Sequence, residues 1–301
     1  MKTKLIYNPY LDMTPTEPDT IKTSMIQAQQ ITFLTGQEWT IVTYDQQLYQ
    51  IAVNILSHEP NLFPKFIPRL GGMHTIMSFV GAIGSLMAGS GLENILETTF
   101  AGVPKLLSGK KFPQNVRALR IVVVELLRPL LSRPDINNYK TLMAYLEFKS
   151  NLSRTTKVWV DCLIKPVLIL LKFIRAEREG AWLLHLLAFE EMMPYFFASG
   201  HANYARYGSY YLQSMNHLHP DIKKRFLNGE HTMHHKDGLW NGIWSDLFIE
   251  STYMRYGKGP SGIIGSTLNE NTVAIWAHSM SIFGQLSNDL KSMQENNKKL
   301  F

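Results

Sequence analysis

The chain contains very little cysteine. Cys162 is the one cysteine among 301 residues, which excludes a disulfide framework and a cysteine-based zinc site and fits a reducing compartment. Residues 1–19 contain no apolar run of the kind found in secretory signals. We therefore expect an intracellular protein, nuclear or cytoplasmic, that is not secreted.

Long uninterrupted apolar runs are also missing. The most hydrophobic stretch, residues 158–174, is broken by two lysines, a proline and Asp161, whereas a membrane span needs about 20 mainly apolar residues. The stretch predicts a buried helix and no membrane partner. The glycine-rich segment "GKGPSGIIG" lacks the spacing of a nucleotide P-loop. It is typical of a turn, with contact between a phosphate backbone and the nearby Arg255 and Lys258 as the alternative.

What remains is a globular and mildly basic composition. Apolar residues make up 45% of the chain and charged residues 18%, which is enough apolar material for a core. The formal charge of +6 modestly favours an acidic partner such as DNA.

The first third of the chain alternates helix and strand patterns. Helix spacing over residues 19–34, with Asp19 or Thr20 as the cap, precedes a β-branched strand over 39–45. A second helix, a shorter strand interrupted by Pro68, and a third helix from His74 follow. Connections this short predict crossovers in a sheet with at least one parallel pair of strands, and Pro68 predicts a sheet edge.

From about residue 91 to 220 no strand pattern is found. The region instead shows long apolar stretches with helical periodicity, at residues 116–131, 139–148, 155–175 and 181–212. A polar loop over 226–238, a helix over 241–257 and a final helix over 271–293 complete the chain. The expected fold class is an α-rich α/β protein.

Histidines crowd the polar loop. His231, His234 and His235 lie in it, and His217 and His219 lie close by in sequence, so a zinc cluster is conceivable. No cysteine and no HExxH arrangement accompanies them. A solvated loop is the favoured interpretation.

Acidic residues give the better candidate site. Asp246 and Glu250 share one face of the predicted 241–257 helix and flank an apolar stripe that includes Trp244. They repel each other, and a bound Mg²⁺ or Mn²⁺ would relieve that repulsion. On spacing alone, boundary acids bridged to Lys or Arg are the stronger alternative. Asp45 follows a buried strand, where open α/β sheets place functional groups; it is equally suited to cap the next helix.

A cluster of aromatic residues surrounds Arg206. Tyr204, Tyr207, Tyr210 and Tyr211 lie close to it in sequence. Mixed aromatic and basic side chains can bind nucleic-acid bases. Helical spacing favours packing over base stacking.

Several segments together resemble a known group of proteins. The motifs "VTYDQQLY", "RLGGMHTIMSFVGAIG" and "HANYARYGSYYL" are similar to those of a multi-copy group of uncharacterised proteins of invertebrate genomes, over residues 15–278. The copy number of that group implies an origin in mobile elements.

More distantly, the order of elements resembles ribonuclease H-like (DDE-type) transposases. The resemblance implies metal-dependent DNA strand cleavage and transfer with Mg²⁺ or Mn²⁺ as cofactor. Asp45 would be the second acid, Glu250 the third, and Asp246 a substitute.

The same resemblance divides the chain into four parts. Residues 1–18 would be an extended segment and 19–90 the α/β part of a partial ribonuclease H-like core. Residues 91–235 would form a large all-helical insertion, and 236–301 would complete the core.

One departure from that pattern matters. The strand that carries the first acid precedes the first helix in such cores, and only 18 residues stand there. We therefore expect a truncated and inactive copy, with a degenerate copy or a disrupted reading frame as alternatives. His74 is a replacement ligand or, more simply, a helix cap. The alternative function is a non-catalytic nucleic-acid-binding or helical scaffold protein.

Overall fold

The computed structural model describes residues 11, 13–100, 112–233 and 241–251, together with positions 274, 278, 282 and 285. The chain divides into two compact units, Met1–Asp246 and Leu247–Phe301. Nearly all of the described residues belong to the first unit.

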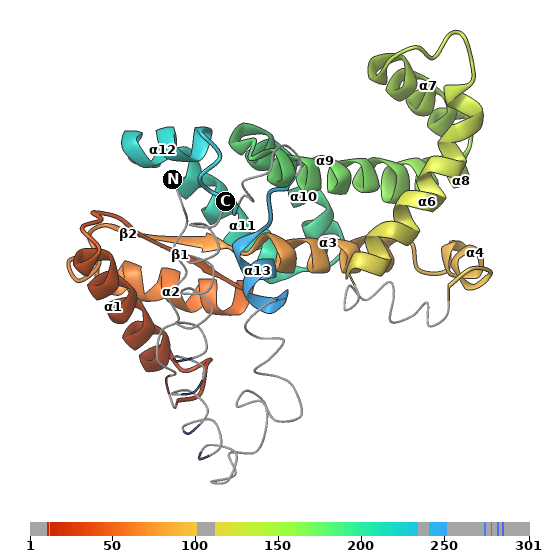
Figure 1. Ribbon diagram of the computed structural model, residues 1–301. Coiled ribbons are helices and arrows are strands. Elements are labelled where there is room, and N and C mark those ends of the chain that lie inside the picture. Colours follow the sequence, from red (N-terminus) through yellow and green to blue (C-terminus); the bar gives the residue numbers. More distant parts are fainter. Residues whose placement is uncertain are drawn as a thin grey trace, which may run out of the picture. The chain divides into compact units, whose positions relative to one another are not determined.

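The first unit opens with the alternation that the sequence predicts. Its elements are α1 (Pro18–Leu34), β1 (Thr40–Tyr44), α2 (Gln46–His58), β2 (Phe66–Leu70) and α3 (Gly72–Leu86). The two strands pair in parallel, with Thr40 opposite Phe66 and Tyr44 opposite Leu70. Helix α2 packs on both strands and α1 packs on α2 (Figure 1). The predicted parallel pair is confirmed.

The ends of these elements follow local chemistry, with one correction. Asp45 caps α2 as expected, since its Oδ1 accepts a hydrogen bond from the Leu48 amide at 2.8 Å. The predicted cap of α1 at Asp19 or Thr20 is wrong. Glu17 is the N-cap residue, without a side-chain hydrogen bond, and Pro18 begins the helix, because proline has no N–H to lose in the first turn and its φ already suits a helix.

Strand β2 tolerates Pro68 in its middle. Pro68 lies opposite Val42 and the pairing continues beyond it to Leu70. In the described part of the chain the sheet has two strands, so β2 has one side without a neighbouring strand, where a missing donor costs little. All five residues of β2 are buried.

A helical region comes next along the chain. Its elements are α4 (Leu92–Glu97), α6 (Phe112–Leu131), α7 (Tyr139–Leu152), α8 (Arg154–Trp159), the π-helical turn η1 (Val160–Ile164), α9 (Lys165–Glu179), α10 (Trp182–Ala198), α11 (Ala202–Asn216) and α12 (Pro220–Leu227). The predicted stretch 181–212 is two helices, because Gly200 turns the chain at a φ of 76° after α10. Among the described residues no helix is long and apolar enough to cross a membrane.

Helix α3 joins the sheet to the helical region. It begins directly after β2 and packs against α6, α9, η1 and α10 (Figure 1). Its inner face is closed by fully buried residues such as Ile76, Phe79 and Ile83. The two regions therefore share one core, and the coarse class, an α-rich α/β protein, is confirmed.

A buried polar centre lies where β2 meets the helices. Arg69 of β2 is 6% exposed, and its Nη1 donates to the His231 carbonyl at 2.8 Å. The guanidinium carbon lies 5.6 Å from the centre of the Trp182 ring and 5.1 Å from that of Phe226. These contacts are cation–π interactions in a desolvated setting.

Three more titratable groups surround this arginine. His185 Nε2 lies 3.1 Å from the Tyr211 hydroxyl, and His185 Nδ1 lies 3.6 Å from the Glu177 carboxylate. Burial, and then the charge of Arg69, lower the pKa of His185 to about 3. Burial raises the pKa of the Tyr211 phenol, and the Arg69 charge opposes that rise. His185 is therefore neutral in the folded protein.

This centre predicts a pH-dependent stability. His185 has a folded pKa of about 3 and an ordinary value of 6.5, so the unfolded chain binds the proton more readily. The stabilisation is present above about pH 6.5 and is lost as the pH falls toward 3, by up to about 1.4 kcal/mol per pH unit. Urea unfolding of the wild type and of His185→Gln should show a shallower pH dependence in the variant.

A comparison of the wild type with His185→Gln isolates the contribution of the His185 imidazole to the pH dependence. Glu177, Arg69, Tyr211 and His231 all face His185 and titrate, or carry charge, in both proteins. Identical pH slopes in the two proteins would show that His185 does not titrate on unfolding as described.

Candidate functional site

The carboxyl ends of β1 and β2 form the base of the candidate site. Asp45 follows β1 and is half-buried, while Gly71 follows β2. The Gly71 amide donates to the Tyr44 carbonyl at 2.7 Å, which holds the two strand ends together. Ligands of open α/β sheets bind at this edge.

Asp246 reaches the same edge from the far end of the unit. Its Oδ1 accepts from the Met73 amide at 3.3 Å and its Oδ2 from the His74 amide at 3.2 Å. Oδ2 also lies 3.1 Å from His74 Nδ1. The N-cap residue of α3 is Gly71, which has no side chain to offer. Asp246, 8% exposed, therefore supplies the cap from a distant part of the chain, where the helix dipole favours a negative charge.

The residues before Asp246 bind the segment to the sheet. Ser245 Oγ donates to Thr43 Oγ1 at 3.0 Å. The Trp244 ring is stacked on Phe173 at a centroid distance of 6.2 Å. A side-chain carbon added at Gly71 would overlap Asp246, and one added at Gly72 would overlap Trp244. The "GG" of the sequence is a close approach between β2, α3 and this segment.

Tyr204 of α11 is affected by the charges of both acids. Burial is the main cause that raises the pKa of its phenol, and the charges of Asp246 and Asp45 raise it further, while hydrogen bonds with Ser78 and Thr75 lower it. Both carboxylates therefore lie close enough to this buried ring to affect its ionisation. The structure brings Asp45 and Asp246 to one edge, and Tyr204 marks the space near both.

The third predicted acid belongs to the other unit. Glu250 is a half-buried residue of α13 (Ser245–Ser251) and lies in the Leu247–Phe301 unit. Its role stays a prediction. The helix that carries it begins later than the predicted residue 241, because Ile243 pairs with Met233 in an antiparallel bridge. The predicted residues 252–257 of that helix lie outside the described residues.

The predicted nucleic-acid contacts have different outcomes. Arg206 is exposed, and its guanidinium lies 5.3 Å from the ring centre of Tyr207. Arg255 and Lys258 lie outside the described residues. The preference for packing in the tyrosine cluster is confirmed for Tyr204, Tyr207 and Tyr211, which are buried; Tyr210 is 41% exposed.

The prediction of a solvated histidine loop is wrong for His231. His231 is 3% exposed, not solvated; its ring lies 4.9 Å from that of Trp182, and its Nδ1 donates to the Phe226 carbonyl at 3.2 Å. His234 and His235 lie outside the described residues. His217 and His219 are exposed.

Sequence patterns missed the buried polar centre. Arg69, Glu177 and His185 are all buried. Arg69 and His185 each stand alone among apolar neighbours, and Arg69 is more than a hundred positions from the other two. The signal was present in one form: a charged residue within a short apolar strand pattern, such as Arg69, needs a partner if the strand is buried.

Comparison with known proteins gives a family. The family model described as "Domain of unknown function (DUF8702)" matches residues 1–144 and 136–299, which together cover almost the whole chain. The chain belongs to this family. No curated protein and no solved structure matches the chain.

The close approach at Gly72 predicts a coupling with Trp244. Gly72→Ala should lower the free energy of unfolding by about 1–3 kcal/mol, because the indole must move out of a packed core. In a Trp244→Ala background the same change should cost almost nothing. A double-mutant cycle by denaturant unfolding measures the coupling, and equal costs in both backgrounds would disprove the contact.

Proposed function

We propose that the chain derives from a mobile element and that its sheet edge is related to the metal site of a ribonuclease H-like DNA strand-transfer enzyme. DNA would be the ancestral substrate. The observation that supports the proposal is the arrival of Asp45 and Asp246, from opposite ends of the unit, at the carboxyl edge of a parallel strand pair. Helical segments inserted after α3 and before Asp246 agree with such an ancestry.

The donor atoms at this edge fit a divalent cation in part. Carboxylate oxygens are the ligands that Mg²⁺ and Mn²⁺ prefer. One oxygen of Asp45 accepts from Leu48, and its other oxygen accepts no hydrogen bond from the described residues. Asp246 already accepts from the start of α3. Among the described residues, no three side chains of His, Cys, Asp or Glu gather closely enough to hold a metal.

A bound cation would be held by Asp45 and Asp246. It would supply positive charge to stabilise a phosphodiester under attack. The protein's own contribution is to hold the two carboxylates at one edge, through the caps of α2 and α3.

The same caps support a second candidate function. Each acid satisfies backbone amides of a helix end, which is a structural role worth about 0.5–2 kcal/mol. A helical scaffold or a non-catalytic nucleic-acid-binding protein would keep both acids for that reason alone. The two functions differ in one respect, which is whether the edge binds a cation.

Calorimetric titration with Mg²⁺ and with Mn²⁺ tests the difference. The wild type should bind Mn²⁺, and Asp45→Asn should weaken binding by at least about tenfold, because one charged ligand becomes neutral while the amide oxygen still caps α2. Asp246→Asn should act in the same direction. Asp221→Asn is the matched control, since Asp221 is an exposed residue of α12.

Thermal unfolding gives an independent readout. Mn²⁺ should raise the melting temperature of the wild type and of Asp221→Asn, but not of Asp45→Asn, because only a ligand of the folded state stabilises it. No binding to the wild type, or equal binding to all four proteins, would reject the metal site and favour the scaffold.

A further inference from the structure

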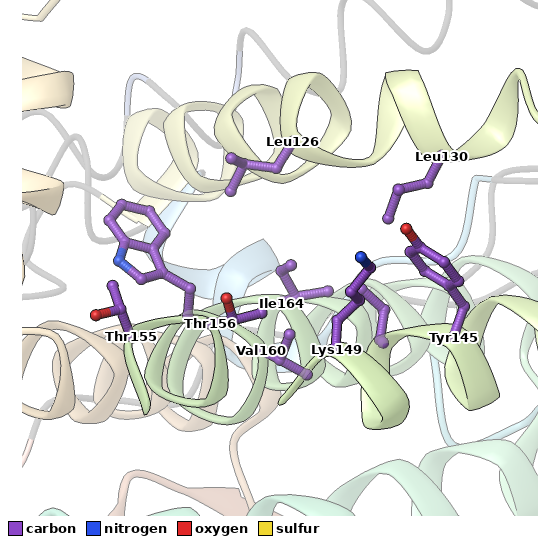
Figure 2. Close-up of a pocket in the computed structure, with 10 residues that line it drawn as sticks. Leu126, Leu130, Tyr145, Lys149, Thr155, Thr156, Val160 and Ile164 are labelled. Atoms are coloured by element: carbon purple, nitrogen blue, oxygen red, sulfur yellow. The ribbon is translucent and has the colours of Figure 1, made fainter. Parts of the chain in front are cut away.

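A cavity lies in the helical region, away from the sheet edge. Its volume is about 340 Å³, at the small end of the range of about 300–1,000 Å³ typical of ligand sites. Residues of α6, α7, α8 and η1 line it. Figure 2 shows Leu126 and Leu130 of α6 on one side and Tyr145, Lys149, Thr156 and Ile164 across from them.

The lining combines an apolar interior with an aromatic ring and a positive charge. Leu146, Val160 and Ile164 are buried, whereas Trp159 is half-buried and Lys149 is exposed. Among the described residues no other ring stacks on Trp159. The Thr155 and Thr156 hydroxyls lie beside it in the lining. A flat ring that enters the cavity would therefore find a stacking surface and hydrogen-bonding groups.

The Tyr145 side chain is held by neighbouring side chains and forms one wall of the cavity. Its hydroxyl accepts from Arg133 Nη1 at 3.2 Å. The Arg133 guanidinium carbon lies 4.7 Å and the Lys149 ammonium 5.5 Å from its ring centre. Two cations therefore lie against one aromatic wall of the cavity. Arg133 is paired with Asp135, so Lys149 is the one of the two that can attract an anion to the rim.

The surrounding segment carries most of the protein's excess positive charge. Residues 112–165 hold nine Lys and Arg but four Asp and Glu, in a chain whose net charge is +6. Each of the four acids forms an ion pair within the segment: Glu125 with Arg128, Asp135 with Arg133, Glu147 with Lys165, and Asp161 with Lys165 and Lys157.

The remaining cations have no such partner. Among the described residues no carboxylate pairs with five side chains of this segment: Arg117, Arg120, Lys140, Lys149 and Arg154. Several cations without local acids along one segment are typical of a protein that binds a polyanion.

The wall of the cavity also departs from regular helix. Val160 and Ile164 bound the π-helical turn η1, and both line the cavity. Single π-helical turns are rare and recur at functional sites. Here the wider turn lies between Trp159 and the continuation into α9.

We propose that this cavity binds one base of a single-stranded nucleic acid, stacked on Trp159, while Lys149 contacts an adjacent phosphate. The positive charge of residues 112–165 favours a polyanion as the ligand. The cavity favours a flat ring, such as a base that is not stacked on its neighbours. A duplex hides its bases from such a cavity, whereas a single strand exposes them.

Single-strand binding at the cavity is independent of the proposed metal site. Neither Asp45 nor Asp246 lines the cavity, so single-strand binding and metal binding can each fail without the other. Binding should persist in the presence of a chelator and in Asp45→Asn.

Fluorescence anisotropy with a labelled oligothymidylate of about 20 nucleotides tests the site. The wild type should bind at low salt, and Trp159→Leu should weaken binding about tenfold or more, as expected for one lost stacked base. Lys149→Gln should weaken binding and reduce the slope of log affinity against log salt by about 0.7, the value for one phosphate contact on a single strand.

Matched controls separate the cavity from general charge and hydrophobicity. Phe148→Leu removes an exposed ring of α7 outside the cavity, and Lys223→Gln removes an exposed charge of α12; both should bind as the wild type does. Trp159→Phe keeps a ring and should retain most of the affinity, which guards against loss of binding through misfolding. An abasic strand of equal length should bind at least about tenfold more weakly.

Several outcomes would overturn the proposal. These are the absence of single-strand binding at low salt, equal affinity for the abasic strand, equal losses in the cavity and control variants, and duplex binding as tight as single-strand binding. A change in wild-type tryptophan fluorescence on addition of dodecanoate, with no oligonucleotide binding, would assign the cavity to an aliphatic anion instead.

Discussion

The buried guanidinium of Arg69 is the constraint on which the rest of the first unit depends. A charge removed from water costs several kcal/mol unless hydrogen bonds and opposite charges replace the solvent. The His231 carbonyl and the Trp182 and Phe226 rings provide that replacement. The strand β2 can therefore occupy its position only when α10, α12 and the turn after α12 are in place. The sheet edge begins two residues after this arginine.

At the sheet edge, the Asp246 carboxylate has two roles to account for, a helix cap and a proposed metal ligand. Asp246 closes the start of α3, where the backbone approaches too closely for any side chain at Gly71 or Gly72. A carboxylate at that place stabilises the helix whether or not a cation binds. The structural need and the proposed metal site therefore preserve the same residue, and only substitutions that keep the cap while removing the charge, such as Asp to Asn, separate them.

The two proposed sites occupy different parts of the sequence and depend on charges of opposite sign. The sheet edge concentrates negative charge from distant parts of the sequence, whereas the cavity lies in a segment that concentrates positive charge, from residue 112 to 165. A protein that binds a single strand through Trp159 and Lys149 needs no metal, and the scaffold function gains a specific ligand from this site. An ancestral DNA strand-transfer enzyme would use both the metal site and the single-strand site.

Much of the fold can be predicted from the sequence alone, because it depends on neighbours along the chain. Hydrophobic periodicity and short connections determine the order of helices and strands, the parallel pair, and the cap that Asp45 provides to α2. The tertiary structure decides what depends on distant partners: the burial of His231, the later start of α13 beside the Met233–Ile243 bridge, and the cap that Asp246 provides to α3. A side chain's spacing reveals which face of its own helix it shares, but the solvent, charge and hydrogen bonds around it also depend on residues far along the chain, as Asp246 and His74 show.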